Sequence, residues 1–568
     1  MKSQLPETTE ELMHAEWKDF EPAATELASY SLNSDNLYEW LADWSTFAGK
    51  GFELYNRLYI ARTLNTDDKQ IEERFNTFMD NFYPELLATE QKLKEKLIAS
   101  NLEPEGFAIP LRNMRSDASL FRESNLPLLS EAMKLSSEYD RIIGTQTVQW
   151  DGEEITITQL RPVFQETDRQ RREDAWRLSM DRWYADRDAI TAVWQKLLPI
   201  RLKIAANADK PDFRTYRWQF LQRFDYTPQD CYSFHDAIEE VVVPAAYHIY
   251  EKRREQLGLD VLRPWDLDVD TTGLPALKPF KNVDELTKKT AIIFNKVDQE
   301  LGQYFSTLMK EDLLDLGNRK HKGPGAYCMD LPSIRRPFVF ANAVGVHDDV
   351  ATLLHESGHA FHFLESCSLP FYHQLNPPME FAEVASMSME LLAAPYLTDD
   401  HDGFYDPSEA ARARIQHIES NILFWPYMSI IDLFQHWVYE NPQAAMDGDA
   451  CDEVFGKLWD RFMPGVDWTG LEKYKVTGWH RKAHIFAEPF YYIEYGLAQL
   501  GATLIYGNAR KDQRAAVANY RKALALGGTV PLPELYKTAG ARLAFDSKTL
   551  KEAIKILKDV LAELQTQI

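Results

Sequence analysis

Two histidines one helical turn apart, with a glutamate directly after the first, are the residues of this chain best suited to chemistry. They are His355, Glu356 and His359, within the segment HESGH. Positions i and i+4 of a helix share a face, so both imidazoles can bind one zinc ion. Glu356 lies about 100° further round the helix, where it can take a proton from water at that ion. The plain alternative is a helix whose histidines are only hydrogen-bonded.

The residues around this motif predict a helix that presents it. Asp348 or Asp349 is a suitable N-cap, apolar residues recur at helical spacing, and no proline intervenes. His362 follows His355 by seven residues, a rise of about 10 Å, which is too far for one tetrahedral ion to bind all three histidines. We therefore expect His362 to support the site from beside the ligands.

A second segment, residues 376–397, supplies the best third ligand. It opens with Asn-Pro-Pro, which is typical of a helix start, and Glu380, Glu383 and Glu390 follow on one broad stripe. Carboxylates among apolar residues are costly to bury unless a positive group compensates them. We predict Glu383 as the third zinc ligand and Glu390 as the acceptor for a ligand imidazole N–H. Glu380 fits a solvated helix face equally well.

Most of the chain has helical periodicity. From Glu166 to Leu198, apolar residues recur at spacings of 4, 3, 7, 4 and 3, as on one face of a long helix. We therefore predict a mainly α-helical protein. Similar periods run through residues 71–100, 287–309, 410–425, 512–526 and 548–564.

Two regions predict strands instead. Residues 147–158 alternate around Asp151-Gly152, a hairpin signal. After Gly323-Pro324-Gly325, a candidate hinge, AYCMD and RPFVFANA are expected to pair as a small sheet beside the zinc-binding helix. An exposed edge of RPFVFANA would bind an extended peptide backbone, with Asn342 taking part, although an Asn there forms turns as often.

Composition excludes several classes of function. The 87 acidic residues exceed the 63 basic ones, and a formal net charge of −24 argues against nucleic acid or an anionic membrane as partner. The first residues lack the features of an export signal, and no apolar run is long enough to span a membrane. We expect free thiols in a reducing cytoplasm, because no paired spacing links Cys231, Cys328, Cys367 and Cys451.

The chain resembles the thimet oligopeptidase and oligoendopeptidase F family of zinc metallopeptidases. The resemblance covers about the last 250 residues, while the N-terminal third matches only in helical character. It is carried by HESGHAFH at 355–362, EFAEVASMSMELL at 380–392, GAYC…PFVFANA at 325–343, HIFAEPFYYIEYGLAQ at 484–499 and GGTVPLPELYKTAGARLAF at 527–545.

The resemblance implies a mainly α-helical, two-lobed ellipsoid around a deep substrate channel, with one zinc ion on its floor. The hairpin lies at a plausible boundary, so we expect residues 1–165 to form an N-terminal helical lobe and residues 166–568 the catalytic domain. The matched residues imply zinc ligands at His355, His359 and Glu383, with Glu356 as the general base.

For the segment at 484–499, the resemblance implies that His484 and two tyrosines stabilise the oxyanion of the reaction. Tyr492 and Tyr495, three residues apart, are the preferred pair. Tyr491 and Tyr495, four apart, share a face equally well and make Tyr491 a candidate substrate contact. Packing in the core is the other use of such aromatic residues.

The function implied is a cytoplasmic, zinc-dependent oligopeptidase that uses activated water to hydrolyse internal bonds of short, unstructured peptides. One alternative is a zinc carboxypeptidase or peptidyl-dipeptidase, which would need a cation for the substrate's C-terminal carboxylate; no single Arg or Lys stands out for it. Another is a helical peptide-binding protein without turnover. Glu356 argues against the latter, because a zinc scaffold needs no base beside its first ligand.

Overall fold

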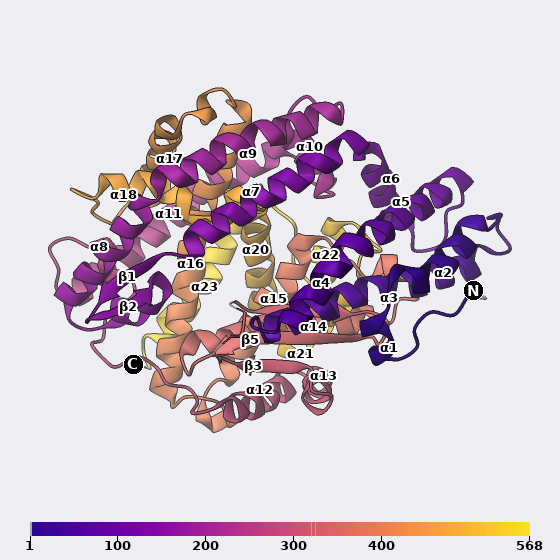
Figure 1. Cartoon of the computed structure of the whole chain (residues 1–568). Coiled ribbons are helices and arrows are strands. Elements are labelled where there is room, and N and C mark those ends of the chain that lie inside the picture. Colours follow the sequence, from indigo (N-terminus) through magenta and orange to yellow (C-terminus); the bar gives the residue numbers. More distant parts are fainter. Residues whose placement is uncertain (1–2, 320, 324, 568) are drawn as a thin grey trace.

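Helices dominate the computed structural model, which describes residues 3–319, 321–323 and 325–567 (Figure 1). The prediction of a mainly α-helical protein is confirmed. The first helices are α1 (Thr9–His14), α2 (Trp17–Ser29), α3 (Leu37–Leu64), α4 (Lys69–Asn81), α5 (Tyr83–Ser100), α6 (Ala108–Leu120) and α7 (Leu126–Gly144). The next are α8 (Arg169–Ala185), α9 (Arg187–Asn207), α10 (Phe213–Phe220), α11 (Pro228–Gln256), α12 (Val283–Val297) and α13 (Gln299–Lys310).

The C-terminal half carries the longest helix and the one that holds the metal-binding motif. Its helices are α14 (His347–Ser366), α15 (Met379–Ala393), α16 (Pro407–Glu440), α17 (Gly448–Phe462), α18 (Glu472–Val476), α19 (Ala483–Phe486), α20 (Tyr492–Ala509), α21 (Gln513–Leu524), α22 (Leu532–Thr538) and α23 (Ser547–Leu564). In Figure 1, α7 and α9 run across the top of the view, and α14 lies with β3 and β5 near the bottom.

Three periodic runs that predict single helices are each divided in two. The run at 166–198 breaks at Asp186, whose carboxylate accepts a hydrogen bond from Gln146 Nε2 at 2.8 Å. The run at 287–309 breaks at Asp298, whose side chain caps α13 by accepting from two backbone N–H groups. The run at 71–100 breaks at Phe82. The apolar residues keep helical spacing across each break, so this spacing does not show where one helix ends and the next begins.

The predicted hairpin is present. β1 (Thr147–Trp150) pairs antiparallel with β2 (Glu153–Thr156). Asp151 and Gly152 both have positive φ, 50° and 87°, as a two-residue type I′ turn requires.

A three-stranded sheet lies beside α14, in the order β3-β5-β4. β4 (Tyr327–Leu331) and β5 (Arg336–Ala343) pair antiparallel, which confirms the predicted pairing of AYCMD with RPFVFANA. β3 (Leu314–Gly317), which the sequence analysis missed, pairs parallel with β5 on its other side.

The prediction that RPFVFANA offers an exposed edge is wrong, because β5 is the central strand and is paired on both sides. β4 forms an edge instead. The Asn342 amide donates to the backbone oxygens of Gly323 and Gly325, at 2.7 and 2.9 Å, and so braces the loop before β4. Asn342 itself lies in β5, so its side chain ties this strand to that loop. The candidate hinge includes Pro324, which lies outside the described residues.

Hydrophobic packing divides the chain earlier than residue 165. One core is formed by α1 to α6 together with Phe371, and its last member before α7 is Met114. Leu120 and the buried face of α7 belong instead to the largest core, where α7 packs on α9. The hairpin contributes Val148 to a small separate core with Leu160, Val163 and Ala175, so it does not lie between these two cores.

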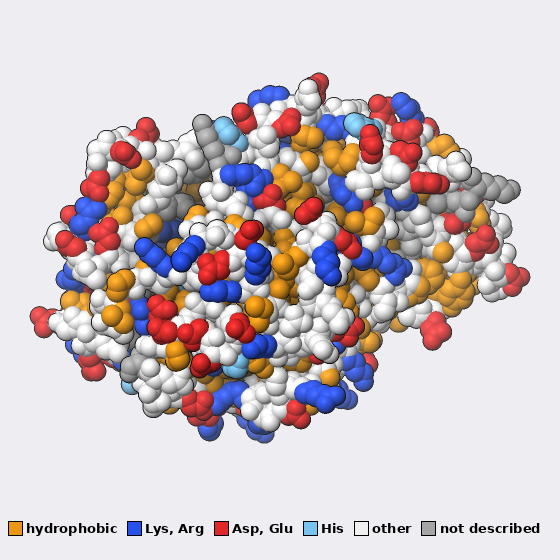
Figure 2. Space-filling view, turned by 90° about the horizontal axis from the view of Figure 1, so that it is seen from below, with side chains coloured by type: hydrophobic (Ala, Val, Ile, Leu, Met, Phe, Trp, Pro, Cys, Tyr) orange, Lys and Arg blue, Asp and Glu red, His pale blue; other side chains and the backbone are white. Residues whose placement is uncertain are grey.

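The surface mixes charges of both signs. Figure 2 shows acidic and basic side chains interspersed with apolar ones on the face seen from below. Among the described helices, none combines the length and apolarity that crossing a bilayer requires. All four cysteines are free thiols.

Candidate active site

The site is built where α14 and α15 cross at very short distance. A Cβ atom at Gly358 would lie 2.5 Å from Ser386 Cα and 2.7 Å from the Ala385 carbonyl oxygen. Only glycine permits this approach, because any side chain would meet backbone atoms. Sequence reasoning assigned Gly358 no role, although it occupies a variable position inside the motif.

The crossing brings the three predicted metal ligands together. The His355 and His359 Nε2 atoms lie 3.5 and 3.8 Å from Glu383 Oε2. The two imidazole rings are 5.0 Å apart and nearly perpendicular, at 83°. One ligand atom from each of the three residues lies within 4.8 Å of the others. Two nitrogens and a carboxylate oxygen are the donors of catalytic zinc sites.

The electrostatics of this cluster also fit a cation. Burial raises the pKa of the Glu383 carboxyl above its ordinary value. Burial disfavours the charged form of His355, yet the hydrogen bond from its Nδ1–H to Glu390 Oε1, 2.7 Å long, helps raise the pKa of this imidazole to about 9. The same bond leaves His355 Nε2 facing Glu383. A metal ion bound between His355 Nε2 and Glu383 would compensate the negative charge of the buried carboxylates.

Glu356 lies on the same helix, with only 7% of its surface exposed. Burial raises the pKa of its carboxyl to about 7, and the backbone N–H of Cys328 on β4 donates to it. The carboxylate is therefore held next to the edge strand of the sheet. A carboxyl with this pKa can both accept and return a proton near neutral pH.

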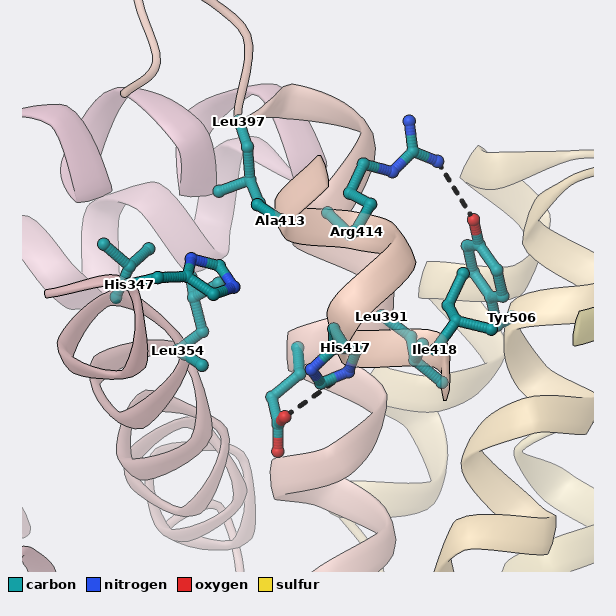
Figure 3. Close-up of a pocket in the computed structure, with 13 residues that line it drawn as sticks. His347, Leu354, Leu391, Leu397, Ala413, Arg414, His417, Ile418 and Tyr506 are labelled. Atoms are coloured by element: carbon teal, nitrogen blue, oxygen red, sulfur yellow. Dashed lines mark hydrogen bonds and ion pairs between the residues drawn. The ribbon is translucent and has the colours of Figure 1, made fainter. Parts of the chain in front are cut away.

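Glu390, which accepts from His355, also lines a neighbouring pocket (Figure 3). Its other oxygen, Oε2, lies 3.5 Å from His417 Nε2 on α16. Figure 3 shows His417 and Arg414 on one helix, with Arg414 directed to the hydroxyl of Tyr506. No local pattern in the sequence marks His417, because α16 meets Glu390 only in the folded chain.

The aromatic segment before and within α20 covers Glu383. The Tyr491 hydroxyl donates to Glu383 Oε1 at 3.2 Å, and the Tyr495 hydroxyl bonds to that of Tyr491. The His484 ring lies 5.9 Å from Tyr491 and 6.1 Å from Tyr495. Tyr492 is buried and points elsewhere, since its hydroxyl accepts from Lys482 Nζ at 2.8 Å.

Two further candidates lie beside the cluster. His362 is buried one turn beyond His359 and packs edge-on to Phe381 at 5.8 Å; burial lowers the pKa of its imidazole to about 3, so it is neutral. Glu380 is also buried and not solvated. Its carboxylate accepts a 2.7 Å hydrogen bond from the Tyr226 hydroxyl.

An arginine that the sequence analysis missed ties this region to α20. Arg223, in the loop between α10 and α11, binds Glu494 Oε1 at 2.7 Å and the Phe490 carbonyl oxygen at 2.6 Å. It also lies 3.8 Å from Glu380. This buried cation thereby links α15 to the start of α20. Its position in a loop far from the motif leaves no spacing signal.

Comparison with known proteins agrees with this geometry. The model of peptidase family M3 matches residues 163–554. An oligoendopeptidase F homolog of Borreliella burgdorferi is 24% identical over 57% of this chain and 54% of its own length. One from Mycoplasma pneumoniae is 21% identical over 81% of this chain and 78% of its own. The aligned part thus spans about half of the first relative.

A solved structure has the same fold along the whole chain. This structure, of PZ peptidase A with an inhibitor, superposes with a TM-score of 0.87 at 24% identity, and each chain is covered completely. The matched family model includes both helices of the metal site and the aromatic segment before α20. The resemblance drawn from the motifs is therefore confirmed, and the chain belongs to peptidase family M3, a family of metallopeptidases.

Proposed function

We propose that the protein is a zinc-dependent oligopeptidase that hydrolyses internal bonds of short, unstructured peptides. The observation that carries this proposal is the juxtaposition of a three-ligand metal site with a buried carboxyl, Glu356, and the hydroxyls of Tyr491 and Tyr495. The oligoendopeptidase F relatives support the same activity. Four unpaired thiols suit a reducing compartment, so we place the enzyme in the cytoplasm.

His355, His359 and Glu383 would hold one catalytic zinc ion. Such an ion supplies a Lewis acid for the scissile carbonyl and lowers the pKa of water. Glu390 fixes the ring of His355 through the Nδ1 hydrogen bond, and His417 stands behind Glu390. This chain of contacts orients the donor nitrogen before substrate arrives.

Glu356 acts as the general base and then as the general acid. Its carboxylate accepts a proton from the attacking water, and the protonated carboxyl gives that proton to the leaving amine. Burial keeps the protonated and ionised forms close in energy near neutral pH, since it raises the pKa to about 7. The Cys328 N–H holds the carboxylate in place during both transfers.

The tyrosine hydroxyls donate to the oxyanion that develops on the scissile carbonyl. We favour Tyr491 with Tyr495 over the pair Tyr492 and Tyr495, because the Tyr491 hydroxyl lies at Glu383, a proposed metal ligand, whereas the Tyr492 hydroxyl lies at Lys482. The Tyr491 O–H would turn from Glu383 to the oxyanion when that charge develops. Burial lowers the pKa of His484 to about 4, so its neutral ring serves as a donor from beside the tyrosines. Each such donor is typically worth a few kcal/mol in the transition state.

The edge strand β4 binds the substrate backbone. It has no strand partner on its outer side among the described residues, and it carries the Cys328 N–H that touches Glu356. A cavity of about 220 Å³ opens beside it, lined by Met329, Asp330 and Tyr372 among others. Backbone pairing of this kind is largely independent of the substrate's side chains, so broad specificity follows.

The test is cleavage of an internally quenched peptide of about eight residues, blocked at both ends. We expect turnover that is lost on chelation and restored by zinc, and that Glu356→Gln abolishes while metal binding persists. Glu453→Gln, on the exposed face of α17, is the matched control and should keep full activity. Trimming of unblocked peptides alone would identify an exopeptidase, and no turnover of either peptide would identify a binding protein.

A further inference from the structure

The cavity of about 220 Å³ beside β4 contains a carboxylate that has no partner. It belongs to Asp330, which is partly buried. In the described part of the chain, this side chain makes no hydrogen bond or ion pair; the Asn56 amide donates to the backbone oxygen of Asp330, at 2.7 Å. An unpaired carboxylate that is shielded from water costs stability, so we expect a ligand that compensates it.

The basic residues that follow Asp330 along the chain do not supply this compensation. Arg335 donates to the Cys367 carbonyl oxygen, and Arg336 binds the Glu311 carboxylate at 2.7 and 3.1 Å. Burial raises the pKa of the Asp330 carboxyl to about 7, and no cation of the described residues opposes this effect. The positive charge that Asp330 lacks therefore has to come from outside the folded chain.

The walls of the cavity continue into the metal site. On β4, the Cys328 N–H that holds Glu356 lies two residues before Asp330, and alternate residues of a strand face the same side. On α14, Phe363 lines the cavity one turn beyond His359, on the same face of the helix. A peptide that is paired with β4 in the proposed manner therefore passes the cavity.

The other lining groups suit a long side chain that ends in a positive charge. Met329, Phe363 and Leu375 provide apolar walls, and Asn56 and Asn376 provide amide groups that can accept N–H bonds. The volume is many times what one water molecule needs. Lys and Arg side chains have the matching form, because an apolar stem carries a charged head with several donors.

We propose that this cavity binds a Lys or Arg side chain of the substrate, with Asp330 as the counter-charge. The proposal rests on the function above, which places the substrate on β4 and the scissile bond at Glu356, near Cys328. Residues opposite each other on paired strands share a face, so the side chain that enters the cavity lies about two residues from the scissile bond. A substrate that tests long-range attraction alone needs a neutral residue at this position.

Peptide binding to the zinc-loaded variant Glu356→Gln tests the cavity without hydrolysis. Two otherwise neutral peptides, blocked at both ends, carry either one Lys or one Gln, so the side chain is the only source of a cation. At pH 8 and high salt, which screens long-range attraction, calorimetry should show binding of the Lys peptide about tenfold tighter. The double variant with Asp330→Asn should bind both peptides alike. Equal binding of the two peptides to Glu356→Gln would overturn the proposal.

The position of cleavage by the active enzyme locates the site. When the Lys is moved along the neutral peptide, the wild-type cut should move with it, and mass spectrometry of the products measures this shift. Asp330→Asn should cut every peptide where it cuts the Gln peptide, whereas Asp80→Asn, exposed on α4, should keep the wild-type pattern. A wild-type cut that ignores the Lys would contradict the assignment. Absence of any cut, with the binding preference intact, would support the cation site and count against the proposed hydrolysis.

Discussion

Glu383 meets three partners within a few ångströms: the Nε2 atoms of His355 and His359, and the hydroxyl of Tyr491. In the proposed mechanism, metal ligation and oxyanion donation are therefore joined through one carboxylate. Tyr492, the neighbour of Tyr491, turns its hydroxyl to Lys482 and lies in the core. Two adjacent tyrosines thus have different roles, which substitution can separate.

Replacement of Tyr491 by Phe should lower kcat about 100-fold with little change in KM, because the lost hydroxyl acts mainly in the transition state. Tyr492→Phe is the matched control and should keep kcat within about threefold of wild type. Steady-state kinetics on one peptide measure both. A larger loss for Tyr492→Phe would return the role to the pair that the sequence favours.

Asp330 gives a prediction about stability and pH. Burial raises the pKa of its carboxyl from near 4 to about 7 in the folded chain. The unfolded carboxyl ionises first as pH rises, so the folded protein loses stability between about pH 4 and pH 7 and remains less stable above. Asp330→Asn should therefore raise Tm by a few degrees at pH 8 and change it little at pH 4.

Thermal unfolding at both pH values measures this effect. Asp80→Asn, on the exposed face of α4, is the control and should leave Tm unchanged at either pH. A variant at Asp330 that is less stable than wild type at pH 8 would show that the carboxylate is compensated in the folded protein.

The spacing of the motif predicts which atoms of His355, Glu356 and His359 share a face, because α14 is a regular helix there. The same use of helical spacing fails for Tyr491, Tyr492 and Tyr495. α20 begins only at Tyr492, and Phe490 has a φ of 66°, which redirects the chain just before Tyr491. Helical spacing therefore does not apply to Tyr491, and its contact with Glu383 depends on a turn that no pattern announces.

At the scale of elements, the separation of α14 from α15 decides whether three ligands can reach one ion. Gly358 sets that separation, because a methyl group there would meet the Ser386 Cα and the Ala385 carbonyl oxygen. Movement of either helix would carry His355 and His359 away from Glu383. The tolerance for metal geometry is only a few tenths of an ångström.

Gly358→Ala should destabilise the protein by about 1–3 kcal/mol through overpacking and weaken zinc binding at least tenfold. Gly144→Ala is the control, because a methyl group at that helix end meets no atom within 4 Å. Zinc affinity by competition with a chelating dye, together with denaturant unfolding, checks both effects. Unchanged affinity in Gly358→Ala would show that the helices can separate without loss of the site.

Element types could be predicted from sequence more fully than element arrangement. The alternation in RPFVFANA predicts a strand, but its central position depends on β3, a four-residue strand with too few positions for a clear pattern. Likewise α14 begins at His347, ahead of the predicted caps. Asp349 acts from inside the first turn, accepting from the N–H groups of Val344, Gly345 and Val346.

For the whole molecule, charge is the property most easily read from sequence and the one that acts over the longest distance. The formal net charge is −24. Because both signs are interspersed on the face in Figure 2, long-range attraction of cationic peptides arises from the sum of the charges. The division between the two hydrophobic cores is harder to predict from sequence, because α7 packs into the larger core with helices that follow it in the chain.

Basic peptides should therefore be cleaved with a higher kcat/KM than acidic ones at low ionic strength, by about tenfold for two Lys against two Glu outside the scissile pair. The difference should shrink toward unity as salt rises, because screening removes long-range attraction. A peptide with Gln at the same positions is the control. A salt-independent ratio would place the preference in local subsites.

The contact between Tyr491 and Glu383 joins segments that leave the ribosome far apart in time. The metal-binding helices are synthesised more than 90 residues before the segment that covers them. A growing chain can thus assemble its ligands while it still lacks the donors that complete the reaction centre. In the proposed mechanism the chain therefore gains its hydrolytic machinery in two steps, the metal ligands first and the oxyanion donors only when the last part of the chain has been made.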